Sequence, residues 1–145
     1  MSISSILTSL ESEVSTLLGA DWSELEYIYD LNQNNSKTFN NRYGIGALNG
    51  SSVDGTTKSI TIDFNFFVVL TKCFVNRSSD EKQRTLLSEI YDKFELINRN
   101  IFQKKLNNAN ILLVSALSYD DPEVVDSNGI AVKVNFTVKY RNQTI

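Results

Sequence analysis

The residues best suited to do chemistry lie in one acidic connection near the C-terminus, Asp120–Gly129. Its carboxylates belong to Asp120, Asp121, Glu123 and Asp126. Oxygen ligands gathered in such a loop could bind a hard cation such as Ca²⁺. The spacing does not match an EF-hand loop, which requires ligands at alternating early positions, a central glycine and a late glutamate. The sequence therefore favours a solvated connection between two strands, with no bound metal.

Catalysis and nucleotide binding are not supported by the remaining candidates. The chain has no histidine, so the commonest general base and transition-metal ligand is missing. Asp63 has no defined acidic partner, which favours a solvated side chain on a strand face. Gly44-Ile45-Gly46 resembles part of a phosphate loop but lacks the lysine and serine or threonine that must follow. We expect neither an enzyme nor a cofactor.

Composition limits the fold and the partners. A chain of 145 residues that is 41% hydrophobic is expected to form a single domain, residues 1–145, with its own core. The single cysteine, Cys73, excludes an internal disulfide and lies in an apolar run, which favours a small buried side chain. With 14 basic and 17 acidic residues the net charge is −3, so the basic stripe of a sequence-specific nucleic-acid binder is missing.

No segment has the features of a membrane span or a secretory signal. A span requires about 20 consecutive apolar residues, and no run of this chain is that long. The first residues carry no cationic segment before their apolar positions, unlike a secretory signal. We therefore expect a soluble intracellular protein that does not contact a membrane.

Two helices are predicted from apolar residues at three-to-four spacing. The first covers Ile3–Leu18 and ends at Gly19. The second begins at Ser78, which has the capping partner Glu81 three residues on, and continues to about Leu106 with a possible break near Asn100. Both helices have an apolar stripe that must pack against another element.

Four strands are predicted from alternation and from β-branched or aromatic residues. They cover Leu25–Leu31, Ser59–Val75, Ile111–Tyr119 and Ile130–Arg141. The second becomes apolar on both faces, which predicts a central strand. In the last strand every even-numbered residue is apolar, and the opposite row is Ala131, Lys133, Asn135, Thr137, Lys139 and Arg141. That second row must meet water or a partner.

The stretch at about 34–57 is polar and punctuated by glycine, and it predicts a long loop. Loops longer than about 12–15 residues in compact domains are usually functional or disordered. Arg42, Tyr43 and Ile45 lie near its middle and are candidate contacts. Together these elements predict an α+β fold, with the N-terminal helix and the long helix packed on one face of a largely antiparallel sheet. The other face would be solvated or covered by another copy of the chain.

The order of these elements resembles that of the tail terminator or tail-completion proteins of long-tailed bacteriophages. The resemblance covers nearly the whole chain: the short N-terminal helix, Arg42–Gly46 in a long loop, the approach to the central strand at Asp54–Phe66, the long helix around Ile90–Phe94, and a closing hairpin. It is a resemblance of size and element order rather than of one motif.

This resemblance implies a structural virion protein without catalytic residues. Family members form a ring, usually a hexamer, on the head-proximal end of the tail tube, where they stop tube growth and dock the neck. The implied partners are copies of the same chain, the tail tube protein and a neck or head-completion protein. The implied location is the virion tail after assembly in the host cytoplasm, and the genome can pass through such a ring.

Charge suggests which residues would meet between neighbouring subunits. The acidic connection, with Asp120, Asp121, Glu123 and Asp126, could meet the strand face formed by Lys133, Asn135, Thr137, Lys139 and Arg141. Exposed ion pairs contribute only about 0–1 kcal/mol each, so they would set register more than affinity. Arg42, Tyr43 and Ile45 in the loop would reach the tube or neck.

Three alternatives stay open at this stage. The chain could be a different neck or head-completion protein of a phage. It could be a small-ligand module with a pocket near Phe64, Phe66 and Phe94, although aromatic residues at this spacing favour a core. It could also be an enzyme that uses only carboxylates and tyrosine, which would require two buried carboxyl groups in one cleft.

Overall fold

The computed structural model describes residues 2–35, 38–56, 59–73, 80–102, 110–125 and 129–143. It confirms the predicted α+β fold. The elements are α1 (Ile3–Leu18), β1 (Ser23–Glu24), the 3₁₀ turn η1 (Leu31–Gln33), β2 (Arg42–Gly55), β3 (Ser59–Cys73), α2 (Asp80–Ile97), the π-helical turn η3 (Asn98–Phe102), β4 (Ile111–Tyr119), β5 (Glu123–Val125) and β6 (Gly129–Gln143).

One sheet joins all of the described strands. Its order is β1-β2-β3-β6-β4, and β5 pairs with the first residues of β6. Every long pair is antiparallel, and only the two-residue pair between β1 and β2 is parallel. β3 pairs with β6 from Ser59 opposite Gln143 to Cys73 opposite Gly129, and it lies in the middle of the sheet as predicted.

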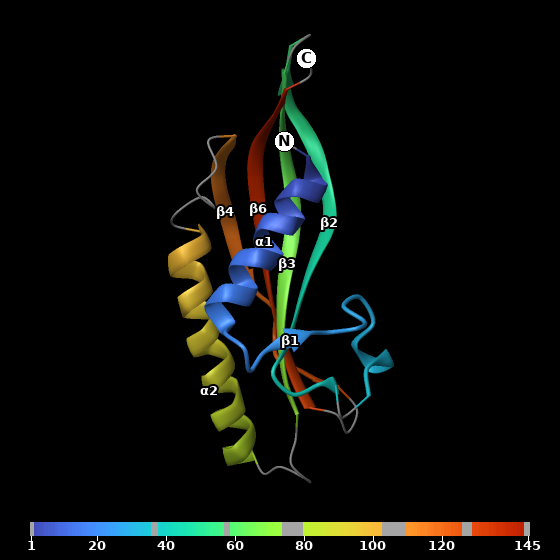
Figure 1. The fold of residues 1–145 in the computed structure, drawn as a ribbon, viewed down its shortest axis with the longest axis vertical. Helices are drawn as coiled ribbons and strands as arrows, with labels where there is room; N and C mark the ends of the chain where they lie inside the picture. The colour runs from blue at the N-terminus through green and yellow to red at the C-terminus, as the bar shows by residue number, and fades with distance from the viewer. Residues whose placement is uncertain are drawn as a thin grey trace.

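Both helices cover the same face of this sheet, which Figure 1 shows toward the viewer. The buried face of α1 consists of Ile6, Leu10, Val14 and Leu18, and α2 contributes Ile90, Phe94 and Ile97. They pack on the even-numbered row of β6, from Ile130 to Tyr140, which is buried throughout. The predicted division of the last strand into a core row and an outer row is therefore confirmed.

The opposite face of the sheet, here called the outer face, is covered only at one end. A second apolar cluster lies there, formed by Leu25, Leu31, Phe39, Phe67, Val69, Val125 and Ala131. It comes from the segment between β1 and β2, from β5 and from the ends of β3 and β6 nearest to them. The chain itself thus covers one half of the face that the sequence left open, and the other half is polar.

The predicted long loop at 34–57 is wrong, because Arg42–Gly55 forms the long strand β2. It pairs with β3 from Arg42 opposite Thr71 to Gly55 opposite Ile60. Its glycines make room for large side chains: an added Cβ at Gly46 would lie 2.3 Å from Phe67 Cε1, and one at Gly50 would lie 2.1 Å from Phe64 Cδ2. Glycine in a strand allows such close approach, so here it does not mark a turn.

The predicted strand at Leu25–Leu31 is also wrong. Only Ser23–Glu24 pairs with the sheet, and the chain then follows an irregular path that the buried Asn34 side chain holds. Asn34 Oδ1 accepts from the Tyr27 backbone N–H at 3.1 Å, and its Nδ2 donates to the Tyr27 carbonyl at 2.8 Å. These bonds satisfy backbone groups that a strand would have paired, so local β propensity is overridden.

The long helix agrees with its prediction where the structure describes it. α2 extends over Asp80–Ile97, and the π-helical turn at Asn98–Phe102 falls at the predicted break. The predicted start at Ser78 and end at Leu106 lie outside the described residues. Neither α1 nor α2, within the part of the chain described, combines the length and the apolar character needed to span a membrane.

Candidate interface

The sheet has an open edge on each side. β4 ends the strand order on one side, and on the other side β1 pairs only with Arg42 and Tyr43 of β2. Beyond Tyr43, no other described strand pairs with that side of β2. Unpaired backbone N–H and C=O groups at an edge are a template for another strand.

The pairing register shows which residues of the β2 edge and the β4 edge lie at the same level along the strand direction. Ser51 of β2 is opposite Asp63, Asp63 is opposite Lys139, and Lys139 is opposite Leu113 of β4. Because each successive pair of long strands is antiparallel, β2 and β4 run in opposite directions. Each edge also exposes a leucine, Leu48 at 50% and Leu113 at 45% of its surface.

The first half of the β2 edge is protected by the chain that follows β1. Leu25 N–H donates to the Tyr43 carbonyl at 2.8 Å. The Tyr29 hydroxyl donates to the Ala47 carbonyl at 2.8 Å and accepts from the Ala47 N–H at 3.1 Å. A bulge between Ala47 and Gly50 follows. The open part of this edge therefore begins just after Ala47.

The uncovered half of the outer face carries a row of uncharged hydrogen-bonded side chains. Thr137 Oγ1 donates to Asn65 Oδ1, and Asn65 Nδ2 donates to Asn49 Oδ1, each at 2.6 Å. The row thus joins β6, β3 and β2. Beside it, Asp63 lies opposite Lys139, and one of its carboxylate oxygens is buried without a hydrogen-bond partner. The residues directly opposite Asp63 are Ser51 of β2 and Lys139 of β6, so neither of these two positions supplies a second carboxyl group.

The predicted basic strand face is divided by the structure. Lys133 is half-buried at the covered end, where its ammonium group lies 5.1 Å from the centre of the Phe67 ring. Lys139 is half-buried and Arg141 is exposed, and both lie at the uncovered end. Asn135 and Thr137 bond within the subunit, to Asp120 at 2.9 Å and to Asn65. Of this row, Lys139 and Arg141 are free to contact a neighbour.

The acidic connection lies on the same subunit surface as Lys133. Asp120 donates its N–H to the Lys133 carbonyl at 2.9 Å and accepts from Asn135 through its side chain. Asp121 and Glu123 are exposed, and Asp126 lies outside the described residues. Asp120 and Lys133 therefore do not lie on opposite lateral surfaces, as the sequence had suggested. In the described part of the chain, no group of three or more Asp, Glu, Cys or His residues could hold a metal ion.

Two of the three candidate loop contacts are core residues. Tyr43 and Ile45 are 5% and 6% exposed, and they pack with the helices. Arg42 is half-buried and donates from Nη1 to the Glu24 carbonyl at 3.3 Å. The correction follows from strand geometry, because Tyr43, Ile45 and Ala47 alternate with Arg42, Gly44 and Gly46. This period of two is the sequence signal for β2, and the intervening glycines conceal it.

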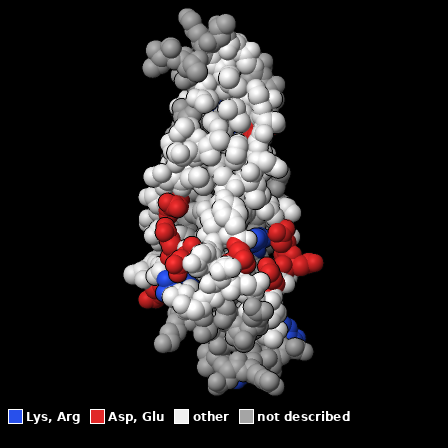
Figure 2. Space-filling model, turned by 90° about the vertical axis from the view of Figure 1, so that its right-hand side faces the viewer, with Lys and Arg blue, Asp and Glu red and all other residues white. Residues whose placement is uncertain are grey.

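Acidic residues gather on the side of the molecule that β2 borders. Figure 2 shows them in a belt across the middle of this side, while the part above the belt carries almost no charge. A hollow of about 150 Å³ in this region is lined by Glu11, Glu24 and Glu26 together with residues 25, 28 and 43–45. Its volume is below the ~300 Å³ of ordinary small-molecule sites.

The predicted aromatic pocket is not supported at its proposed residues. Phe66 and Phe94 are fully buried, and Phe66 stacks on Phe136 with 5.8 Å between ring centres. Phe64 is half-buried and packs against Phe66. These aromatic side chains form the core, which was the interpretation that their spacing favoured.

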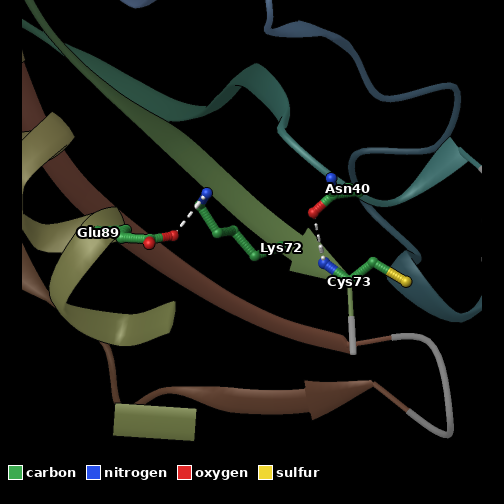
Figure 3. A network of polar contacts seen from close by, with 4 residues as sticks. All are labelled: Asn40, Lys72, Cys73 and Glu89. Atoms are coloured by element: carbon green, nitrogen blue, oxygen red, sulfur yellow. Dashed lines mark hydrogen bonds and ion pairs between the residues drawn. The ribbon is translucent and has the colours of Figure 1, made fainter. Parts of the chain in front are cut away.

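Polar contacts connect the end of β3 to the surrounding elements, as Figure 3 shows. Lys72 Nζ pairs with Glu89 of α2 at 2.8 Å and lies 5.5 Å from the centre of the Trp22 ring. Cys73 N–H donates to Asn40 Oδ1 at 3.1 Å. Burial raises the pKa of the Cys73 thiol, which favours its protonated, unreactive form. Cys73 is half-buried rather than fully buried.

Comparisons with models of known protein families and with curated proteins found no match to this chain. A proposal for its function must therefore rest on the fold, the two open edges and the resemblance in element order. One part of that resemblance, the loop position of Arg42–Gly46, does not hold, because these residues belong to β2.

Proposed function

We propose that this protein is a ring-forming tail terminator of a long-tailed bacteriophage. It would cap the head-proximal end of the tail tube and join it to the neck as a structural component of the virion. The α+β fold and the element order support this proposal. The observation that carries it is the pair of open edges, β2 and β4, on one antiparallel sheet.

The strand directions suit a closed ring. Of the described strands, four are long, and their directions alternate across the order β2-β3-β6-β4. If copies are related by rotation about an axis parallel to the strands, β4 of one copy lies beside β2 of the next and runs antiparallel to it. This contact is heterologous, because two different edges meet, and heterologous contacts generate rings when the rotation closes.

The two edges also match in height and in surface character. Ser51 and Leu113 lie at the same level of the sheet, so an unstaggered ring would bring them together. The exposed Leu48 and Leu113 would lose contact with water in such a joint, which favours association by about 25 cal/mol for each Å² of apolar surface buried. Backbone hydrogen bonds between β4 and β2 would set the register.

The polar half of the outer face would line the bore of this ring, with the helices outside. The side chains of Asn49, Asn65 and Thr137 form hydrogen bonds with one another. Tight nucleic-acid binding normally requires several Lys or Arg contacts to phosphates. The hydrogen-bonded row would offer a genome no charged contact, and the charged residues described beside it are Asp63, which lies opposite Lys139, and Arg141.

The mass of the assembly tests this proposal. Native mass spectrometry or light scattering of the purified protein, alone and with tail tubes, should detect a ring, with a hexamer expected. A strictly monomeric protein under both conditions would refute the proposal. A ring that binds the neck but not the tube end would instead identify another neck or head-completion protein.

Single substitutions test which surface forms the ring. Leu113→Lys and Leu48→Lys place a charge at the proposed joint, a device that natural edge strands use against pairing. Each should abolish or strongly reduce the ring while the monomer stays folded. Val124→Lys is the matched control, because Val124 is 54% exposed but lies on β5 opposite Ile130, at the other end of β6 from the level of Leu113 and Lys139. If all three variants form rings as the wild type does, the β2 and β4 edges are not the joint.

A further inference from the structure

The Tyr29 side chain makes an unusual contact with the edge of β2. Its hydroxyl donates to the Ala47 carbonyl at 2.8 Å and accepts from the Ala47 N–H at 3.1 Å. Tyr29 belongs to the irregular segment between β1 and η1, so it is not part of the sheet. The residue is 64% exposed, and its ring packs edge-on against Phe67 with 5.5 Å between centres.

This contact reproduces what a neighbouring strand would provide. In an antiparallel ladder, a hydrogen-bonded pair of residues exchanges two bonds, one from each N–H to the opposite C=O. Ala47 directs both groups away from β3, and one hydroxyl satisfies both of them. Tyr29 therefore occupies the position of a partner residue at the point where the open part of the edge begins.

The surroundings leave space for the tyrosine at this position. An added Cβ at Gly46 would lie 3.0 Å from the Tyr29 hydroxyl and 2.3 Å from the Phe67 ring. Glycine at position 46 thus lets Phe67 and Tyr29 lie across β2. Because the Tyr29 ring is largely exposed, its hydroxyl can leave Ala47 without opening the core.

We propose that the Tyr29 hydroxyl is a displaceable placeholder for strand β4 of a second copy. The inference rests on the proposed ring. In the free subunit, Tyr29 satisfies Ala47 and opposes pairing along β2. During assembly the arriving strand takes over both Ala47 bonds, and the tyrosine hydroxyl turns to water.

The identity of the occupant follows from strand direction, height and shape. β4 is the other open edge and has the direction that antiparallel pairing with β2 requires. Ala47 lies at the level of Phe136, through Phe66 of β3. At this same level β4 has a bulge between Ser115 and Ser118, and β2 has its own bulge directly after Ala47. Bulges bend a strand and increase its local twist, so the two edges bend at corresponding places.

The test compares Tyr29→Phe with Tyr27→Phe. The first removes the hydroxyl and keeps the ring on Phe67. The second is a matched control, because Tyr27 lies in the same segment, is 42% exposed, and its hydroxyl forms no hydrogen bond with the described residues of β2. Circular dichroism and thermal unfolding should show that both variants fold as the wild type does.

Self-association is measured by sedimentation velocity over a range of concentrations. Tyr29→Phe should associate at about tenfold lower concentration than the wild type, which corresponds to ~1.4 kcal/mol and to the loss of one or two neutral hydrogen bonds that opposed pairing. Tyr27→Phe should associate as the wild type does. Hydrogen exchange gives a second measurement: the Ala47 amide should exchange faster in monomeric Tyr29→Phe and become protected in the assembly.

The outcomes separate this inference from the proposed function. If the wild type forms rings and Tyr29→Phe associates equally or more weakly, the placeholder is refuted and the ring stands. If the Ala47 amide exchanges at the same rate in both monomers, the placeholder is also refuted. If the wild type stays monomeric with tail tubes while Tyr29→Phe associates, the placeholder is supported and the tail-terminator role is refuted. Monomers throughout would refute both.

Discussion

Gly46→Ala tests whether β2 is glycine-rich because aromatic side chains lie across it. The added methyl carbon would lie 2.3 Å from Phe67 Cε1 and 2.5 Å from Cζ. Carbon atoms in contact normally keep about 3.5–4.0 Å apart, so the ring would have to retreat by roughly 1 Å. Phe67 is only 2% exposed and is held between Tyr29 and the Lys133 ammonium group. The substitution therefore overpacks the second apolar cluster.

The expected net loss of stability is about 0–2.5 kcal/mol, with a central value of about 1 kcal/mol. Overpacking a filled site costs about 1–3 kcal/mol. Replacing glycine by alanine within a strand recovers about 0.5–1 kcal/mol, because the unfolded chain becomes less flexible. For a domain of this size each kcal/mol lowers the melting temperature by about 2–4 °C. Urea unfolding followed by circular dichroism measures the change in free energy directly.

Two further variants make this prediction specific. Gly55→Ala is the matched control at the other end of β2, because its added Cβ would meet Ile60 Cγ1 at 3.6 Å, an ordinary contact. It should leave stability unchanged or raise it slightly. Phe67→Leu removes the clashing ring atoms, so Gly46→Ala should cost less in that background. The reasoning fails if Gly46→Ala is as stable as Gly55→Ala, or if its cost does not depend on residue 67.

Three other stability predictions follow from single side chains. Burial raises the pKa of Tyr140 above its ordinary value of about 10. As the pH rises, the unfolded chain therefore loses this proton before the folded chain does. The stability that neutral Tyr140 contributes is present below pH ~10 and is lost as the pH rises through the higher pKa of the folded state. The free energy of unfolding in urea should then fall less steeply above about pH 10 in Tyr140→Phe than in the wild type, and equal slopes would contradict this assignment. Asn34→Ala should cost about 1–3 kcal/mol, because buried backbone groups lose their partner, whereas the exposed control Gln33→Ala should change unfolding little. Glu89→Gln should cost no more than about 1 kcal/mol in the same assay, since Glu89 is 51% exposed and its bond to Lys72 is screened by water; a larger loss would mean that this pair fixes α2 to the sheet.

The helices and the strands β3, β4 and β6 could be predicted from sequence because their apolar residues recur with a regular period. The alternation from Ile130 to Tyr140 identified a core row that is buried at every position. The three-to-four spacing of α1 identified Ile6, Leu10, Val14 and Leu18 in the same way. In these elements the polarity of each residue matches its burial, so a local sequence pattern is sufficient to predict the element and its buried face.

The glycines within β2 and the irregular path of the segment before it could not be interpreted from local sequence, because distant residues determine them. Gly46 and Gly50 are explained by Phe67 and Phe64 on the next strand, and the irregular path of residues 27–31 is explained by Asn34. A short window of sequence does not show which distant side chains a residue will contact in the fold. The candidate contacts Tyr43 and Ile45 failed for a different reason: they are core residues of β2, and the glycines between them conceal the local alternation that indicates a strand.

Backbone pairing makes the edges of β2 and β4 a better candidate interface than the charged residues that the sequence suggested. Exposed ion pairs contribute about 0–1 kcal/mol each. Within one subunit, the Asp120 carboxylate already accepts a hydrogen bond from Asn135, and the Lys133 ammonium group lies over the Phe67 ring. Each unpaired edge instead offers a row of backbone donors and acceptors whose spacing admits only a strand, and a slip by one residue would reverse every side chain. If copies pair through these edges as proposed, the Tyr29 hydroxyl at Ala47 would delay pairing of free subunits until the neighbouring strand displaces it. Specificity in such a protein comes from when an edge becomes available as much as from what it contacts.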